Sequence, residues 1–234
     1  MPPPERIPAG FWLRYAAWSL DAACLLPLLL LLGWPILGAA VGQAEAAMRA
    51  VGAGMAQQLE GAVASGQTPL AMTLGLLSDP RMTAAVAQLS SALTTVLLAP
   101  PLLYVLLACP WSLAFECSRG QATPGKRVFG LVVGDAQGDR LTLPRALARF
   151  AAAGLSWLTL NLGHAMVLLA PHLALHDRLT QTRVLVEPAR RALPRWGRAW
   201  LLLQLVAGVL ATAWLLVAMR DGMQSLLSQA PGAP

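Results

Sequence analysis

The chain has 234 residues, of which 56% are hydrophobic and only 12% are charged, with eight tryptophans and a formal net charge of +6. This composition is too apolar for an ordinary soluble domain and is typical of a multi-pass membrane protein. The positive charge does not indicate a nucleic-acid-binding protein, because the basic residues are dispersed beside apolar segments and form no basic helix. We therefore expect contact with membrane lipids and none with nucleic acid.

Four apolar segments are candidates for membrane spans, because each is long enough as a helix to cross a hydrocarbon core of about 30 Å. They cover residues 14–40, 93–115, 150–170 and 199–219. The third holds several polar residues near its middle and is the weakest candidate. The sequence therefore predicts an all-α membrane protein with about three full spans plus one segment that either re-enters or crosses as a fourth span.

An amphipathic stretch lies between the first two spans, in an insertion at residues 43–91. Its apolar residues recur at spacings of three and four, which is typical of a helix with one apolar face. These residues are Met48, Val51, Met55, Leu59 and Val63. Gly66 and Pro69 then interrupt the pattern. We expect a pair of external helices joined near residues 66–69.

The distribution of Lys and Arg predicts the orientation. If the third apolar segment crosses the membrane, 9 of the 17 basic residues lie on the side of the N-terminus and 8 on the other side. If it enters and leaves on the same face, the counts become 14 and 3. Because Lys and Arg concentrate on the cytoplasmic side, we expect a re-entrant hairpin with its turn near residues 161–163. The N-terminus is then cytoplasmic.

The loop at residues 116–149 is expected on the cytoplasmic side. The segments VFGLVV, DAQGDR and LTL predict a short β-hairpin. Before them, TPGKR forms a turn that carries Lys126, the sole lysine of the chain, and Arg127; both are candidates for contact with a phosphate or with carbonyl groups. After them, LPRALARF places Arg145 and Arg149 four residues apart, which predicts an interfacial helix with both arginines facing anionic lipid.

Charged residues also occur at the edges of apolar segments. Arg14 and Asp21 are two helical turns apart, so Asp21 lies about 10 Å deeper on nearly the same face. An aspartate at that depth costs roughly 2.5–3.5 kcal/mol unless it is paired, protonated or hydrated. The sequence His176-Asp177-Arg178 follows the third segment. We expect Asp177 to pair with Arg14, and Arg178 or His164 to approach Asp21.

Three blocks together, GFWLRYAAWSLD, GQATPGKRVFGLVVGDAQGDRLTLPRALARF and ALHDRLTQTRVLV, resemble the RDD family of bacterial membrane proteins. The family's arginine and two aspartates correspond to Arg14, Asp21 and Asp177. The resemblance implies a multi-pass protein of the bacterial cytoplasmic (inner) membrane, with an RDD-like domain at residues 1–186 and an added C-terminal span and tail at 187–234. Some members resemble cation/proton antiporters, and a eukaryotic relative is a membrane cofactor of a ubiquitin-ligase assembly.

The polar cluster of Arg14, Asp21, His176, Asp177 and Arg178 admits more than one role. A structural clasp in an accessory membrane protein is the first hypothesis, with a protein partner or a second copy bound through external helices. A monovalent cation/proton or small-solute transporter using Asp21 and Asp177 is the alternative, and recognition of a lipid head group is a third. No zinc motif, phosphate loop or catalytic constellation occurs, so we expect no enzyme, metal or cofactor.

Overall fold

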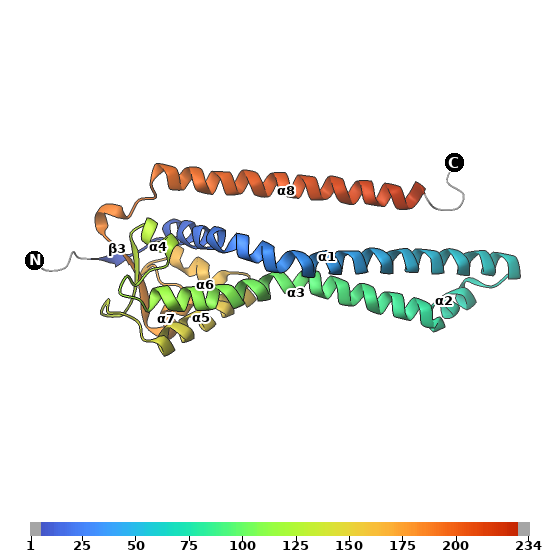
Figure 1. Ribbon diagram of the computed structural model, residues 1–234, viewed down its shortest axis with the longest axis horizontal. Helices are drawn as coiled ribbons and strands as arrows, with labels where there is room; N and C mark the ends of the chain where they lie inside the picture. Colours follow the sequence, from blue (N-terminus) through green and yellow to red (C-terminus); the bar gives the residue numbers. More distant parts are fainter. Residues whose placement is uncertain (1–5, 229–234) are drawn as a thin grey trace, which may run out of the picture. The chain divides into compact units, whose positions relative to one another are not determined.

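The computed structural model describes residues 6–228, without the side chains of residues 223 and 225–228. Within this range, three helices are long and apolar enough to cross a membrane (Figure 1). They are α1 (Phe11–Ser65), α3 (Pro80–Glu116) and α8 (Arg195–Ser228). The prediction of an all-α membrane protein with about three full spans is confirmed. The chain divides into two compact units, Met1–Pro27 with Val105–Leu215 and Leu28–Tyr104 with Leu216–Pro234.

The second unit contains the predicted external helices, but the first of them is not separate. α1 continues without a break for 55 residues, or about 80 Å at 1.5 Å per residue, which is far longer than a bilayer requires. It ends just before Gly66, whose φ of 64° suits a glycine. Thr68 then accepts a hydrogen bond from Ala71 N and caps α2 (Pro69–Ser78), which leads into α3.

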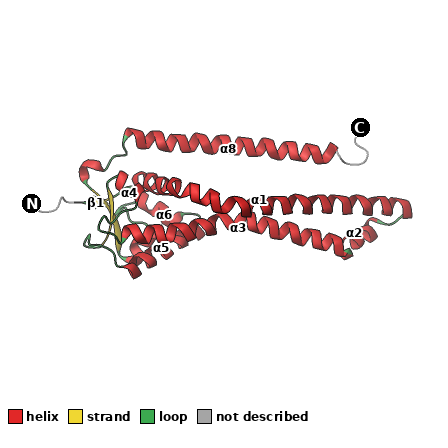
Figure 2. Ribbon diagram, in the orientation of Figure 1, coloured by secondary structure: helices red, strands yellow, loops and turns green. Residues whose placement is uncertain are grey.

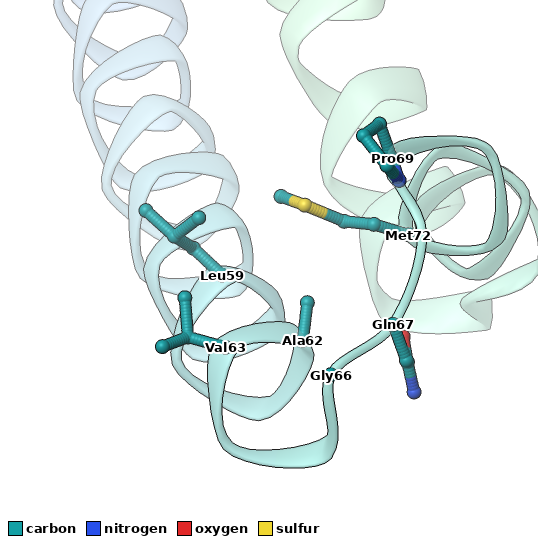
Figure 3. Close-up of a pocket in the computed structure, with 7 residues that line it drawn as sticks. All are labelled: Leu59, Ala62, Val63, Gly66, Gln67, Pro69 and Met72. Atoms are coloured by element: carbon teal, nitrogen blue, oxygen red, sulfur yellow. The ribbon is translucent and has the colours of Figure 1, made fainter.

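A shallow pocket of about 350 Å³ lies at the turn between α1 and α2. Figure 3 shows Met72 of α2 pointing towards α1, where Leu59 and Val63 are more than half exposed. The pocket is mainly apolar, and its lining includes no ionisable residue: Leu59, Ala62, Val63, Gly66, Gln67, Pro69 and Met72.

The first unit contains a three-stranded antiparallel sheet, shown in yellow in Figure 2. Its order is β1 (Ile7–Pro8), β3 (Thr182–Val186) and β2 (Leu131–Asp135). Val186 faces Ile7 on one side and Leu131 on the other. The start of α1 packs on this sheet through small apolar residues, and the buried core is formed by Ala9, Leu13, Ala16, Ala17, Phe129, Leu131, Val133, Leu141, Ala146, Val184 and Val186.

The prediction of a local β-hairpin is wrong about which strands pair. β2 was expected to pair with the LTL segment that follows it, but its partner is β3, about fifty residues later. The turn itself forms, because Asp135 Oδ1 accepts hydrogen bonds from the backbone N–H groups of Gln137 and Asp139. The chain cannot continue as a strand because Pro144 lies in the first turn of α5 (Leu143–Leu158), where proline favours helix initiation.

The third apolar segment forms a bent helical hairpin. α5 is followed by α6 (Leu162–Ala165) and a 3-10 turn at Met166–Leu168, with a bend of 110°. Leu160 and Asn161 adopt positive φ at the bend, close to the predicted turn. The segment starts after β2 and returns through α7 (Leu175–Thr180) to β3, so both its ends meet in one sheet. Paired strands cannot lie on opposite sides of a bilayer, and this geometry supports re-entry over a fourth crossing.

The start of α8 is fastened to α1 within the first unit. Ser19 Oγ accepts hydrogen bonds from Trp200 Nε1 at 3.0 Å and from Gln204 Nε2 at 3.1 Å. Trp196 stacks on Phe129, which follows α4 (Pro124–Val128), with ring centroids 4.7 Å apart. The added C-terminal helix is therefore joined to the same core that carries the sheet.

Candidate functional site

The predicted pair of Arg14 and Asp177 is present. Arg14 lies in the first turn of α1, and its Nη1 donates to Asp177 Oδ2 at 2.5 Å. Its other nitrogens donate to backbone carbonyls: Nε to Ala9 and Nη2 to His172 and Val184. The side chain of Asp177 is completely buried. The arginine thus joins α1 to both β3 and the end of the hairpin.

Arg149 contributes a second guanidinium that the sequence did not predict at this position. It lies on the buried face of α5, where Nη1 donates to Asp177 Oδ1 and to Thr182 Oγ1. Its side chain is only 8% exposed. The prediction that Arg149 faces anionic lipid is therefore wrong. Arg145, four residues earlier, is partly exposed, and its Nη1 lies 3.5 Å from Asp135 Oδ2.

Glu116 and Lys126 extend the network on its other side. Glu116, the last residue of α3, is buried, and its Oε2 lies 3.6 Å from Arg149 Nε. Its Oε1 accepts a hydrogen bond from Lys126 Nζ. The lone lysine therefore pairs with a carboxylate rather than capping carbonyl groups. A chain of alternating charges results: Arg14, Asp177, Arg149, Glu116 and Lys126.

Asp21 is held by partners other than those predicted. Its carboxylate accepts hydrogen bonds from Thr123 Oγ1 at 2.5 Å, from Gly125 N at 2.8 Å and from Trp111 Nε1 at 3.3 Å. Thr123 and Gly125 belong to the TPGKR block, so Asp21 satisfies a backbone N–H at the start of α4 that has no partner within that short helix. Neither Arg178 nor His164 donates to it among the described residues.

Of the remaining predicted residues, Arg178 and Arg127 lie outside the buried network and His176 lies within it. Arg178 is exposed and makes no side-chain hydrogen bond or ion pair with the described part of the chain. Arg127 is exposed but has partners within the chain. Its Nε donates to Ala122 O, and its guanidinium lies 5.4 Å from the Phe115 ring centroid. His176 is buried, with Nε2 3.5 Å from Asp177 Oδ1. His176 therefore belongs to the cluster and Arg178 does not.

The buried chain of ion pairs contains three positive charges, Arg14, Lys126 and Arg149, and two negative charges, Asp177 and Glu116. Asp21 lies outside this chain, because its hydrogen-bond partners are neutral groups. Burial by itself would raise the pKa of Asp177, but the Arg149 and Arg14 guanidiniums hold that pKa well below its usual range. The carboxylate therefore stays ionised at neutral pH. Paired in this way, buried charges join elements of structure, whereas one charge left alone would be strongly unfavourable.

Acidification is expected to destabilise the protein through His176. Burial, followed by the positive charge of Arg149, lowers the pKa of His176 to about 2 in the folded protein. The unfolded chain binds this proton below about pH 6.5, so the folded state loses stability as the pH falls. Between pH 7.5 and pH 5, the loss should reach about 2 kcal/mol, measured by unfolding in detergent.

The matched variant for this pH dependence is His176→Gln, which should reduce the slope because it removes the titrating ring. Equal slopes for both proteins would contradict the assignment to His176.

The ionised Asp177 contributes to stability in a separate pH range, because its stabilisation is complete above about pH 4 and is lost only below that pH.

Two of the network residues had only weak signals in the sequence. Glu116 is the first charge after an uncharged run from residue 82 to residue 115, and Lys126 is the one lysine among many arginines. Each is unusual in its local context, but nothing in the sequence shows that they are neighbours. Their pairing depends on the loop that folds back from α3 to α4.

The arrangement agrees with a comparison to known families. A sequence model of the RDD family matches residues 8–181 of this chain. The chain belongs to the RDD family. The match contains Arg14 and Asp177, which form an ion pair, and Asp21, whose carboxylate binds the TPGKR turn, and it ends before α8 begins.

An individual relative is similar to the chain over a shorter stretch. The chain is 27% identical over 95 residues to the uncharacterized protein YxaI of Bacillus subtilis (strain 168). The alignment covers 41% of this chain and 63% of that protein. No solved structure matches the chain. Family membership therefore establishes a multi-pass membrane protein of the RDD type.

Proposed function

We propose that this RDD protein is an accessory protein of the bacterial cytoplasmic membrane, and that its polar network is a structural clasp. Asp21 carries the proposal, because its carboxylate is buried and already accepts three hydrogen bonds. A carboxylate that carries ions needs a hydrated approach and a free acceptor. Here the acceptor positions are used to hold Trp111 and the TPGKR turn against α1.

Asp177, the second aspartate of the family, supports the same proposal. It binds Arg14 of α1 and Arg149 of α5 while accepting a hydrogen bond from Ala174 N at 3.0 Å. Three parts of the fold thus meet at a single carboxylate. A side chain with this many partners is suited to fixing the re-entrant hairpin against the first span rather than to binding and releasing a cation.

The external helices are the proposed surface for a membrane-protein partner or a second copy of the chain. α1 extends well beyond the length of a single crossing, and the extension carries apolar side chains that are about half exposed or more. These are Met48, Met55, Leu59 and Val63. At the proposed cytoplasmic boundary, exposed arginines such as Arg178 and Arg183 suit contact with anionic lipid head groups.

The variant Asp21→Asn distinguishes the clasp proposal from the transporter hypothesis. The amide keeps the shape of the carboxylate and can still accept from Gly125 N, but it cannot exchange a proton. We expect a folded variant of reduced thermal stability, and no cation-driven proton flux in proteoliposomes of either wild type or variant. Flux through the wild type that Asp21→Asn abolishes would show that the transporter hypothesis is right and the clasp proposal wrong.

The orientation has its own test. With the N-terminus in the cytoplasm, the segment at Pro188–Arg190 is cytoplasmic and the end of α8 is external. In a variant without native cysteines, Arg190→Cys should be protected from a membrane-impermeant thiol reagent applied to intact cells, whereas Gln224→Cys should be labelled. Both side chains are exposed. Labelling of position 190 from outside would contradict the proposed topology.

A further inference from the structure

Three buried polar atoms gather where α5, α6 and α7 meet. Ser156 Oγ, His164 Nδ1 and His176 Nδ1 are buried and have no hydrogen-bond partner among the described residues. The two imidazole rings lie 5.2 Å apart between centroids and are tilted by 57°. Buried polar groups in folded proteins are nearly always hydrogen-bonded to protein or to water, so three unpaired atoms at one junction indicate a bound molecule.

Gly163 shows how tightly Ser156 is packed into this junction. A Cβ at Gly163 would collide with Ser156 Oγ and would lie 2.9 Å from Leu175 Cβ. Gly163 is the neighbour of His164, and Leu175 is the neighbour of His176. The serine hydroxyl therefore lies against the backbone that carries both histidines, although the three residues come from three different helices.

The hydrogen-bonding roles of these atoms follow from their surroundings. His176 Nε2 lies 3.5 Å from the ionised Asp177 carboxylate, which favours the tautomer with its proton on Nε2. Nδ1 is then an acceptor that needs a donor. Ser156 can donate its own hydroxyl proton, so the junction offers at least one acceptor and one donor to a bound molecule.

Charge limits what that molecule can be. The groups that face His176 are Arg149 of α5, Arg14 of α1, Asp177 and the neutral ring of His164. Two guanidiniums and one carboxylate leave an excess of positive charge, which disfavours a metal ion or an ammonium group beside the rings. The best fit is a small neutral molecule that can both donate and accept hydrogen bonds.

We infer that Ser156, His164 and His176 bind one buried water molecule, which donates to the two Nδ1 atoms and accepts from the serine hydroxyl. Buried waters typically make about three hydrogen bonds to polar groups that lack protein partners. This water would join the two arms of the re-entrant hairpin, through contacts that involve none of the clasp's ion pairs. Because Ser156 and His164 belong to none of the clasp's ion pairs, variants at these two residues test the water separately from the proposed function.

The sign of a stability change distinguishes a hydrated junction from a dry one. If the water is present, Ser156→Ala and His164→Phe each remove one of its partners and should lower the Tm by about 2–4 °C. The double variant should lose less than the sum of the two, because both act on the same water. Ser65→Ala, at an exposed serine, is the control and should change the Tm by no more than about 2 °C.

Other outcomes would overturn the inference. A rise in Tm for either single variant would mean that the junction is dry, since an apolar group then replaces an unpaired polar one. Additive losses would mean that the two residues share no ligand. A Tm increase of the wild type in ZnCl₂ that His164→Phe abolishes would assign the junction to a metal ion instead.

Discussion

Asp177→Ala is expected to lower the free energy of unfolding by about 3–5 kcal/mol. The substitution leaves the guanidiniums of Arg14 and Arg149 without their shared carboxylate, and their side chains are only 13% and 8% exposed. The measurement is reversible unfolding, or the Tm where unfolding is irreversible, of protein purified in one detergent.

Glu187→Ala is the matched control for this variant. Glu187 also pairs with an arginine, with Oε2 3.8 Å from Arg190 Nε, but the two side chains are 44% and 63% exposed. Its removal should change the stability by less than about 1 kcal/mol. A loss of the same small size for Asp177→Ala would mean that the buried network does not hold the fold together.

Gly125→Ala is expected to destabilise the protein by about 2–3 kcal/mol or to prevent its folding. A Cβ at this position would collide with the carbonyl oxygen of Ala17 and lie 2.9 Å from Asp21 Cγ. The first of these is backbone, so a side-chain rotation cannot relieve the contact. The TPGKR turn would have to move away from α1 and would lose its hydrogen bonds to Asp21.

Gly52→Ala is the comparison that isolates this effect. Gly52 lies inside α1, and a Cβ there meets no atom within 4 Å. Alanine is the better helix former, so this variant should gain about 0.5–1 kcal/mol. Similar effects of the two substitutions on Tm would contradict the packing of the turn against α1.

The long spans and the Arg14–Asp177 pair were predictable from the sequence because each depends on a local signal. Hydropathy predicts the spans, and two opposite charges at the same membrane boundary predict a pair. The partners of Asp21 were not predictable, because they come from the end of α3 and from the segment after it, 90 to 104 residues away in the sequence. The same holds for β3 as the partner of β2, since the turn after Asp135 suggests a local hairpin.

Arg149 illustrates a different limit. A pair of arginines four residues apart on an amphipathic helix is a common pattern for contact with anionic lipid, and Arg145 is indeed partly exposed. The pattern cannot show that buried carboxylates lie next to Arg149. That information is in Asp177 and Glu116, which lie in segments far away in the sequence.

A double-mutant cycle between Arg14 and Asp177 tests the clasp most directly. Arg14→Met, Asp177→Leu and the double variant are compared with the wild type by their free energies of unfolding in the same detergent. If the pair fastens the re-entrant hairpin to the first span, each single variant should be strongly destabilised and the double variant should lose less than the sum of the two, with a coupling free energy of about 1.5–3 kcal/mol. A coupling within about 0.5 kcal/mol of zero, the range for independent sites, would contradict the clasp.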